Sequence, residues 1–257
     1  DIHGKPEVIR NFYEKNKERL QLDTGNNHII LLGDVGANYA LQGQQDARFK
    51  KALSKYPFTY VCLRGNHEAR VQKVMEMHPE KWEAKKKYGG EIYVEKKFPR
   101  IEYLSDGPAV YEFDGYKTFS LPGAYSVDKW YRLNHGWAWF EDEQLSEEEM
   151  NTGRKIKEVE PEIDLVISHT CPISYEPRDL FLPYISQETV DKRMEQYLGE
   201  IEEGLSYKRW AFGHFHADRL YPRKDGRQML MLFNRSVVDL QRFMHMTEYD
   251  GLQDILA

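Results

Sequence analysis

The chain has 257 residues, of which 40% are hydrophobic and 30% are charged, a balance typical of a globular protein rather than a disordered one. Its 36 basic and 42 acidic residues give a formal net charge of -6, which does not favour nucleic-acid binding, although a local basic patch stays compatible with it. No apolar run approaches the roughly 20 residues needed to cross a bilayer, so we expect residues 1-257 to form one soluble domain.

The cysteine content and the first residues of the sequence indicate the cellular compartment in which we expect the protein. Cys62 and Cys171 are too few for a disulfide framework and lie in or beside apolar runs, so we expect them to be reduced. The first residues show no basic-then-apolar secretory pattern, although a targeting segment ahead of Asp1 would not be visible in this sequence. A cytoplasmic location without a membrane partner is therefore expected.

Four short apolar runs end abruptly in polar turns that contain histidine or aspartate. Such runs are typical of buried strands, and ligands of α/β sheets bind at the carboxyl ends of the strands. The sequence therefore predicts an α/β fold with a polar site at these strand ends. The runs and the turns that follow them are 29–32 with Gly33 and Asp34, 60–63 with residues 64–68, 165–168 with His169, and 210–212 with residues 213–216.

Helices and a hairpin are predicted between these strands. One helix begins near Pro6, because proline suits a first helical turn, and another begins at Ser146, where Glu149 completes a capping box. A third is predicted over about 187–203, with five apolar residues at helical spacing and a glycine at its end. Residues 109–121 show the strand, Asp-Gly turn and strand pattern of a hairpin.

The remaining long segments are charged and aromatic. We interpret residues near 70–108 and 172–208 as excursions of the single domain that lie at the edge of the site. The run from Lys85 to Lys87 is interpreted as a solvated helix face.

Histidines gather in these strand-end turns and in the opening Asp1-Ile2-His3-Gly4. In extended chain, residues i and i+2 project to the same side, so Asp1 with His3 can direct two ligands at one point, as can the last pair of histidines. Imidazole nitrogen mixed with carboxylate and amide oxygen suits manganese, iron, zinc, cobalt or nickel better than calcium. Two ions fit this number of ligands better than one, with Asp34 able to bridge them. Five of the nine histidines belong to the group: His3, His67, His169, His214 and His216.

Each of these residues has an ordinary structural interpretation when taken alone. A single histidine is more often a surface or capping residue, Asp34 could be a turn residue, and Asn66 could cap a following helix. It is their combination that favours a metal site. The histidines outside the motifs are interpreted as structural or surface residues: His28, His78, His135 and His245.

The motifs together resemble the calcineurin-like metallophosphoesterase superfamily, of the bacterial or phage type. The resemblance reaches from residue 1 to residue 216 and implies an α/β fold arranged as a four-layer α/β/β/α sandwich with a mixed two-sheet core. It also implies a strand directly before Asp1. The motifs are Asp-Ile-His-Gly at 1–4, Gly-Asp at 33–34, Gly-Asn-His-Glu at 65–68, Ser-His-Thr at 168–170 and Gly-His-Phe-His at 213–216.

The resemblance implies which residues bind two divalent metal ions, here expected to be manganese, iron, zinc or nickel. His67 would stay free of metal and act on the substrate, either by stabilising the phosphoryl group or as general acid. A hydroxide that bridges the metals would be the nucleophile. The implied ligands are Asp1, His3, Asp34 and His216 for the first ion, and Asp34, Asn66, His169 and His214 for the second.

One departure from the family concerns its Ser/Thr protein phosphatase branch, which the segment 63–68 partly resembles. That branch carries an Asp-Arg pair after its second Gly-Asp, and this sequence has Ala37 and Asn38 there. The aspartate would orient the catalytic histidine and the arginine would bind phosphate. Other basic residues near the motifs could bind phosphate, although each is more often a solvated charge: Arg64, Arg70, Lys129, Arg132 and Arg178.

Three functions remain open, and a phosphomonoesterase acting on a phosphorylated small molecule or a phosphoprotein leads. A phosphodiesterase or nuclease is the second, and a non-catalytic scaffold of the same fold is the third. An aromatic group could stack on bases, but core packing is the better interpretation of its members Trp130, Tyr131, Trp137, Trp139 and Phe140.

Overall fold

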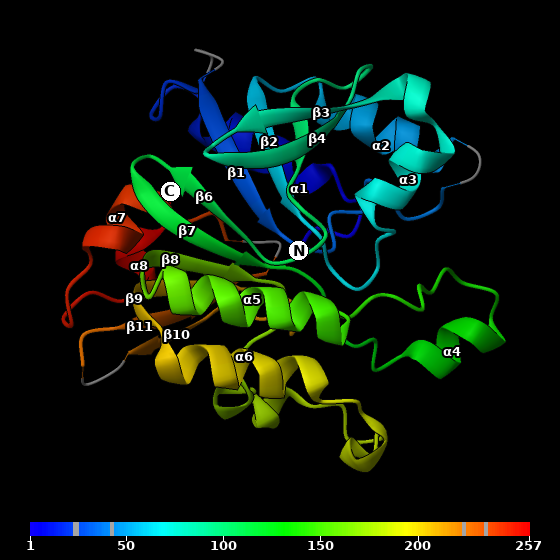
Figure 1. Ribbon diagram of the computed structural model, residues 1–257. Helices are drawn as coiled ribbons and strands as arrows, with labels where there is room; N and C mark the ends of the chain where they lie inside the picture. Colours follow the sequence, from blue (N-terminus) through cyan, green and yellow to red (C-terminus); the bar gives the residue numbers. More distant parts are fainter. Residues whose placement is uncertain (23–25, 42–43, 223–224, 234–235) are drawn as a thin grey trace.

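Two mixed β-sheets form the centre of the molecule in the computed structural model, which describes residues 1–22, 26–41, 44–222, 225–233 and 236–257 (Figure 1). The first sheet has the strand order β1-β2-β5-β4-β3 and the second has the order β10-β11-β9-β8-β7-β6. The strands of the first sheet are β1 (Asn27–Leu32), β2 (Phe58–Leu63), β3 (Trp82–Lys87), β4 (Gly90–Glu95) and β5 (Ile101–Tyr103). Those of the second are β6 (Ala109–Phe113), β7 (Tyr116–Leu121), β8 (Glu162–Ser168), β9 (Ser206–Phe212), β10 (Arg219–Pro222) and β11 (Gln228–Met231).

Successive side chains along each strand point to alternate faces of the sheet, and this explains how the layers pack. In β2, Tyr60 and Cys62 join an apolar cluster with the helices on the outside of the first sheet, whereas Val61 and Leu63 face the second sheet. Successive side chains of a strand point to opposite faces, so a strand covered on both faces reads as a continuous apolar run. The predicted strands at 29–32, 60–63, 165–168 and 210–212 are confirmed within β1, β2, β8 and β9.

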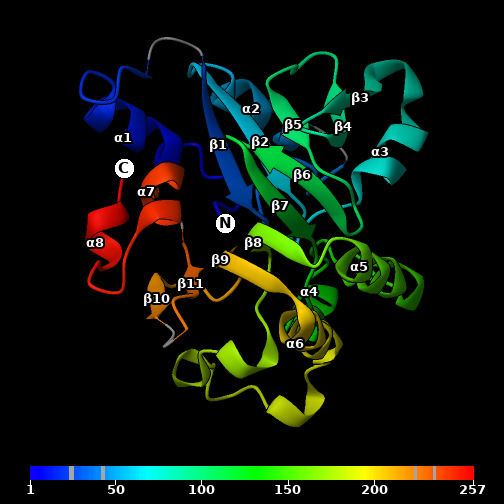
Figure 2. The ribbon, with the colours of Figure 1, turned by 60° about the vertical axis from the view of Figure 1, so that its left-hand side comes forward.

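Helices cover the outer face of each sheet, which confirms the predicted four layers. Figure 2 views α5 and α6 nearly end-on, and their apolar side chains pack on the face of the second sheet that points away from the first. The helices are α1 (Glu7–Asn16), α2 (Gln45–Leu53), α3 (Val71–Met77), α4 (Lys129–Asn134), α5 (Glu147–Val159), α6 (Arg193–Gly204), α7 (Leu240–His245) and α8 (Leu252–Ile255). Short 3₁₀ turns lie at Pro79–Lys81, Ile173–Tyr175, Arg178–Leu180 and Gln187–Thr189.

Three local predictions differ from the structure. The third helix begins at Arg193 rather than near 187, because residues 187–189 form a separate 3₁₀ turn and Val190 is extended. The lysines at 85–87 lie in β3, at the end of a sheet, where exposed lysines suit a strand edge. Core packing is wrong for three of the aromatic residues around α4, since the exposed fractions are 65% for Trp130, 52% for Tyr131 and 52% for Trp137. Phe140 does pack against the apolar core of the first sheet.

A cavity of about 470 Å³ lies along β1, between α1 and the second sheet. Its walls are largely apolar, with Ile30 and Leu32 on one side and Ile167 and Leu230 on the other. β2 pairs with one edge of β1, and no strand of the described ranges pairs with its other edge. In the described part of the chain, no helix combines the length and apolar character needed to cross a membrane.

Candidate metal centre

Turns from both sheets meet at one site because the strands that precede them end at the same place. Asp34 follows β1 and Asn66 follows β2 in the first sheet, while His169 follows β8 in the second. Backbone bonds place the opening segment beside them, since the N–H of His3 donates to the carbonyl of Asp34 at 2.7 Å. The sequence positions are far apart, but the sheet topology brings them together.

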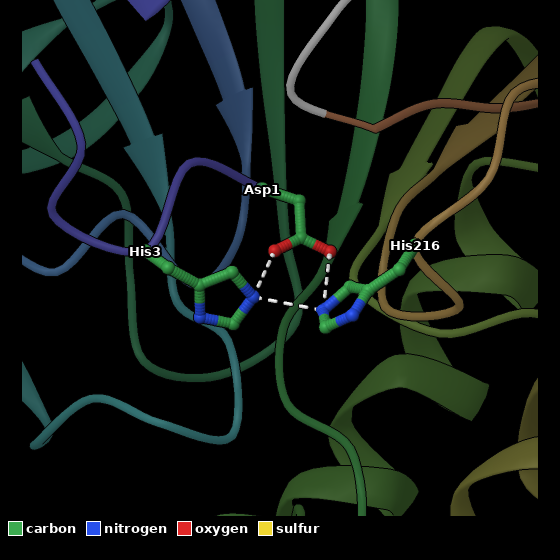
Figure 3. A group of neighbouring side chains, drawn as sticks. All are labelled: Asp1, His3 and His216. Atoms are coloured by element: carbon green, nitrogen blue, oxygen red, sulfur yellow. Dashed lines mark hydrogen bonds and ion pairs between the residues drawn. The ribbon is translucent and has the colours of Figure 1, made fainter. Parts of the chain in front are cut away.

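Asp1, His3 and His216 converge on one point, as Figure 3 shows. Their potential ligand atoms all lie within 4.8 Å of one another. Nε2 of His3 is 2.8 Å from Oδ1 of Asp1 and 2.8 Å from Nε2 of His216. The buried Oδ1 of Asp1 nevertheless has no hydrogen-bond partner among the described residues. Two imidazole nitrogens and a carboxylate oxygen therefore face each other across a space that a cation would suit.

Asn66 and His169 form a second group of facing acceptors. Nδ1 of His169 lies 2.7 Å from the carbonyl of Leu32, which can only accept, so Nδ1 of the neutral ring carries the proton. Nδ2 of Asn66 donates to Oγ of Ser126 at 2.9 Å, and this turns Oδ1 of Asn66 towards His169. Oδ1 of Asn66 and Nε2 of the neutral His169 ring then lie 2.8 Å apart, and each presents a lone pair to the other. A cation is the group that would relieve this contact.

Asp34 lies between the two groups. Its Oδ2 is 3.9 Å from Nε2 of His3, and its Oδ1 is 3.6 Å from Nε2 of His169. His214 completes the second group: its ring centroid is 5.1 Å from that of His169, and its backbone N–H donates to Oδ2 of Asp1 at 2.9 Å. The structure thus brings together all seven residues that the sequence suggests as ligands.

Burial sets the protonation states in this site. It lowers the pKa of His3, lowers that of His216 to about 4, and takes that of His214 well below its usual range. Burial alone would raise the pKa of Asp34, yet the positive charge that His169, His67 and His3 carry when they are protonated holds it well below its ordinary value. Neutral imidazoles and an ionised carboxylate are the forms that bind metal.

The backbone at the site adopts conformations that are unusual for residues other than glycine. His3, Asp34, His214 and His216 have φ values of 46°, 46°, 68° and 56°. Such left-handed conformations cost free energy and persist where the surrounding structure enforces them, as at functional sites. Gly33 is required for a different reason, since a Cβ there would lie 2.1 Å from Nδ1 of His169.

His67 lies at the edge of the two groups with its side chain 14% exposed. Its backbone N–H donates to Oδ1 of Asp34 at 2.9 Å, and its Nε2 lies 3.8 Å from Oδ2 of the same residue. Nε2 is also within 3.1 Å of Nη2 of Arg132 and 3.2 Å of Nδ2 of Asn66. Burial, with the charge of Arg132 as a further cause, lowers the pKa of His67 to about 4 although Asp34 acts to raise it.

Comparison with known proteins identifies the family. The family model for calcineurin-like phosphoesterases matches residues 1–218. The chain belongs to the calcineurin-like phosphoesterase family. Membership implies metal-dependent hydrolysis of phosphoester bonds, so the protein is a hydrolase.

Among solved structures, the chain is similar to TT1561 of Thermus thermophilus, with a TM-score of 0.53 at 11% identity over 94% of this chain and 92% of that one. This likeness concerns the fold alone. A second structure, the phosphopantetheinyl hydrolase of Mycobacterium tuberculosis, has a TM-score of 0.41 at 13% identity over 84% of each chain. No match was found among the curated proteins.

Other residues of this calcineurin-like phosphoesterase that no sequence motif indicated lie beside the site. Ser126 and Glu143 lie behind Asn66, and neither stands at a strand end or in a repeated pattern. Arg132 was one of several basic candidates, and spacing alone could not single it out. Only the folded loop between β7 and α5 brings these residues to the site.

The four histidines outside the motifs of this phosphoesterase lie elsewhere. Three of them contact a nearby backbone carbonyl: His28 that of Asn26, His135 that of Tyr131, and His245 that of Gln241. His78 contacts the amino group of Lys81. Their contacts agree with the predicted structural or surface role.

Proposed function

We propose that this phosphoesterase hydrolyses phosphomonoesters with two divalent ions, from among manganese, iron, zinc and nickel. The position of Asp34 carries the proposal, because its two carboxylate oxygens face different ligand groups at 3.9 and 3.6 Å. One ion would be held by Asp1, His3, Asp34 and His216, and the other by Asp34, Asn66, His169 and His214. Nitrogen and oxygen donors in these numbers suit the ions named.

The residues fit metal binding on two independent observations. The buried Oδ1 of Asp1 accepts no hydrogen bond among the described residues, although it lies 2.8 Å from Nε2 of His3, and a cation there would offset the cost of burying it. Asn66 and His169 place two acceptors 2.8 Å apart. Substituting the ligands of either group should therefore weaken metal binding.

Bound ions would polarise the phosphoryl oxygens and make a water molecule nucleophilic near neutral pH. The chain itself positions the groups around them. Asp34 holds the backbone of His67, and the ring of His67 is placed to donate a proton to the leaving oxygen or a hydrogen bond to the phosphoryl group. The negative charge of a bound phosphate ester would raise the pKa of His67 towards the protonated form that can donate.

Two further aspects belong to the same proposal. The substrate is a phosphorylated small molecule or phosphoprotein, since the net charge of -6 does not favour a nucleic-acid backbone. The location is the cytoplasm, where a reducing environment suits the two buried free cysteines, Cys62 and Cys171.

The test starts from metal-stripped protein, with manganese, iron, zinc or nickel added singly and bound metal counted per chain. Hydrolysis of an aryl phosphate and of a bis-aryl phosphate is then measured. We expect activity to return with metal, two ions per chain, and a higher kcat/KM for the monoester. Asp34→Asn should lose at least about 100-fold in activity and bind less metal.

A matched control is Asp114→Asn, which changes an exposed carboxylate in the turn between β6 and β7. It should retain both activity and metal content. Metal-independent hydrolysis, or full activity in Asp34→Asn, would contradict the proposal. A preference for the diester would show a phosphodiesterase instead.

A further inference from the structure

Arg132 lies beside His67 although it belongs to a helix outside both sheets. Helix α4 projects to the right in Figure 1, but the side chain of Arg132 is buried. Its Nη2 is 3.1 Å from Nε2 of His67. The arginine thus reaches the site from a segment that contains none of the strand-end motifs.

The guanidinium group of Arg132 is held from several sides. Its Nε lies 2.9 and 2.8 Å from the two carboxylate oxygens of Asp128, one helical turn earlier. Its Nη1 donates to the carbonyl of Ala138 at 3.3 Å and to the hydroxyl of Tyr39 at 3.4 Å. A buried guanidinium needs such partners to offset its desolvation, and they also fix the direction of its planar fork.

Nη2 of Arg132, the nitrogen that faces the site, has no acidic partner among the described residues. Asp128 lies within ion-pair distance of Arg132 and contacts its Nε. The neighbour of Nη2 is the imidazole of His67. A fixed guanidinium nitrogen that contacts no carboxylate can donate to an anion.

The other basic candidates near the motifs either contact other groups of the protein or are exposed to solvent. Arg64 and Arg70 are bound by backbone carbonyls and carboxylates within the protein. Lys129 lies over an aromatic ring, 4.1 Å from its centroid. The side chain of Arg178 is 78% exposed. Among these five residues, Arg132 is the one in contact with His67.

We propose that Arg132 binds the phosphoryl group of the substrate and that Asp128 is its positioning residue. The inference rests on the proposed function and narrows its substrate class to phosphomonoester dianions, because a fixed cation favours the ester with the greater negative charge. Arg132 thereby supplies a phosphate-binding cation, which this sequence lacks at Asn38.

The first test measures binding of inorganic phosphate to the metal-loaded protein by titration calorimetry. Arg132→Ala should raise the Kd for phosphate at least about 10-fold, since a charge-assisted contact of this kind is lost, and Arg132→Lys should recover part of the affinity. Arg178→Ala is the matched control and should bind phosphate like the wild type. Metal content and Tm are measured for each variant, so that misfolding is recognised. Wild-type phosphate affinity in a folded Arg132→Ala would overturn the proposal.

The second test compares kcat/KM for a monoester and a diester. Arg132→Ala should lose about 100-fold on the monoester and far less on the diester, whereas equal losses on both would show a structural role and overturn the proposal. Asp128→Asn should weaken phosphate binding, although by less than Arg132→Ala does. Asp128→Glu, which keeps a carboxylate beside Arg132, should bind phosphate like the wild type. If the wild type binds phosphate through Arg132 but hydrolyses neither ester, the proposed function fails and this inference stands.

Discussion

Asn66 is oriented by a chain of two hydrogen bonds that ends at a buried carboxylate. Its Nδ2 donates to Oγ of Ser126 at 2.9 Å, and that hydroxyl donates to Oε2 of Glu143 at 2.5 Å. Glu143 also accepts from the backbone N–H of Ser126 at 2.9 Å. The direction of each bond is thereby fixed, and the oxygen of the Asn66 amide is left facing His169.

Ser126→Ala should weaken metal binding without removing a ligand. With its amide no longer held, Asn66 can rotate its nitrogen towards His169, and we expect a loss of about 10- to 100-fold in metal affinity, the range for residues that support metal ligands. The Kd for the metal is measured by competition with a chelator. Ser54→Ala, which removes a hydroxyl at the end of α2, should leave the Kd unchanged. Equal metal affinity in wild type and Ser126→Ala would show that Asn66 needs no such support.

Glu195 is a buried acid that contacts Thr170, the residue after the proposed ligand His169. One oxygen accepts from Oγ1 of Thr170 at 2.7 Å, and the other has no hydrogen-bond partner among the described residues. Burial, opposed by the hydrogen bond from Thr170 and reinforced by the charge of Glu176, raises the pKa of Glu195 to about 7, and Lys192 acts to lower it. The folded state therefore keeps a proton that the unfolded chain releases near pH 4.

This difference predicts a loss of stability as the pH rises. The contribution is fully present below about pH 4 and is lost progressively up to the folded pKa of about 7. Glu195→Gln should reduce the fall in the free energy of unfolding between pH 5 and pH 8 by about 2 to 3 kcal/mol. Urea unfolding of metal-free protein measures this, with the exposed Glu188→Gln as control. If the variant and wild type show the same pH dependence, Glu195 is ionised in the folded protein.

At the scale of elements, a helix start that depends on contacts within one turn could be predicted from the sequence. A helix start that depends on tertiary contacts could not. The capping box of α5 is confirmed, because Ser146 and Glu149 bond each other's backbone directly. The start of α6 was placed too early because the apolar spacing continues back to Val190. A tertiary contact outweighs it, since Lys192 binds Glu176 and holds the segment before the helix in another conformation.

Packing between α5 and α6 depends on a glycine. A Cβ at Gly153 would lie 1.8 Å from the hydroxyl oxygen of Tyr197, a buried side chain on the neighbouring helix. That hydroxyl has no hydrogen-bond partner among the described residues. Glycine in a helix normally costs about 1 kcal/mol relative to alanine, so its presence here reflects the space available.

Gly153→Ala should destabilise the protein by about 1 to 2 kcal/mol, because the overlap with Tyr197 outweighs the gain in helix propensity. In a Tyr197→Phe background the same substitution should cost much less, since the overlapping oxygen is gone. Urea unfolding of the four proteins gives the coupling free energy, which we expect to be at least about 1 kcal/mol. Additive effects of the two substitutions would show that the cost of Gly153→Ala does not come from the hydroxyl of Tyr197.

At the scale of the whole molecule, the candidate site could be anticipated where it depends on strand ends. Asp34, Asn66 and His169 follow strands whose carboxyl ends meet, so their approach follows from the topology. Arg132 could not be chosen in this way, because its position depends on how the loop containing α4 folds back. The same applies to Ser126, which is recognisable only from its contact with Asn66.

The proposed metal ligands come from both sheets, which predicts that metal stabilises the whole fold. Asp34 and Asn66 follow strands of the first sheet, and His169, His214 and His216 follow strands of the second. Ions bound between them would hold the two sheets together and would be released on unfolding. Binding at 100 times the Kd adds about 2.7 kcal/mol to the free energy of unfolding, which corresponds to a rise in Tm of roughly 5 to 10 °C for a chain of this size.

Thermal unfolding with and without a chelator, followed by titration with manganese or zinc, measures this stabilisation. Tm should rise with metal concentration in the wild type and in Asp114→Asn, because that control leaves every proposed ligand in place. In Asp34→Asn the dependence should be strongly reduced, since both proposed ions lose a shared ligand. A Tm that is independent of metal, in protein shown to bind two ions, would mean that the unfolded chain binds the ions as tightly as the folded site does.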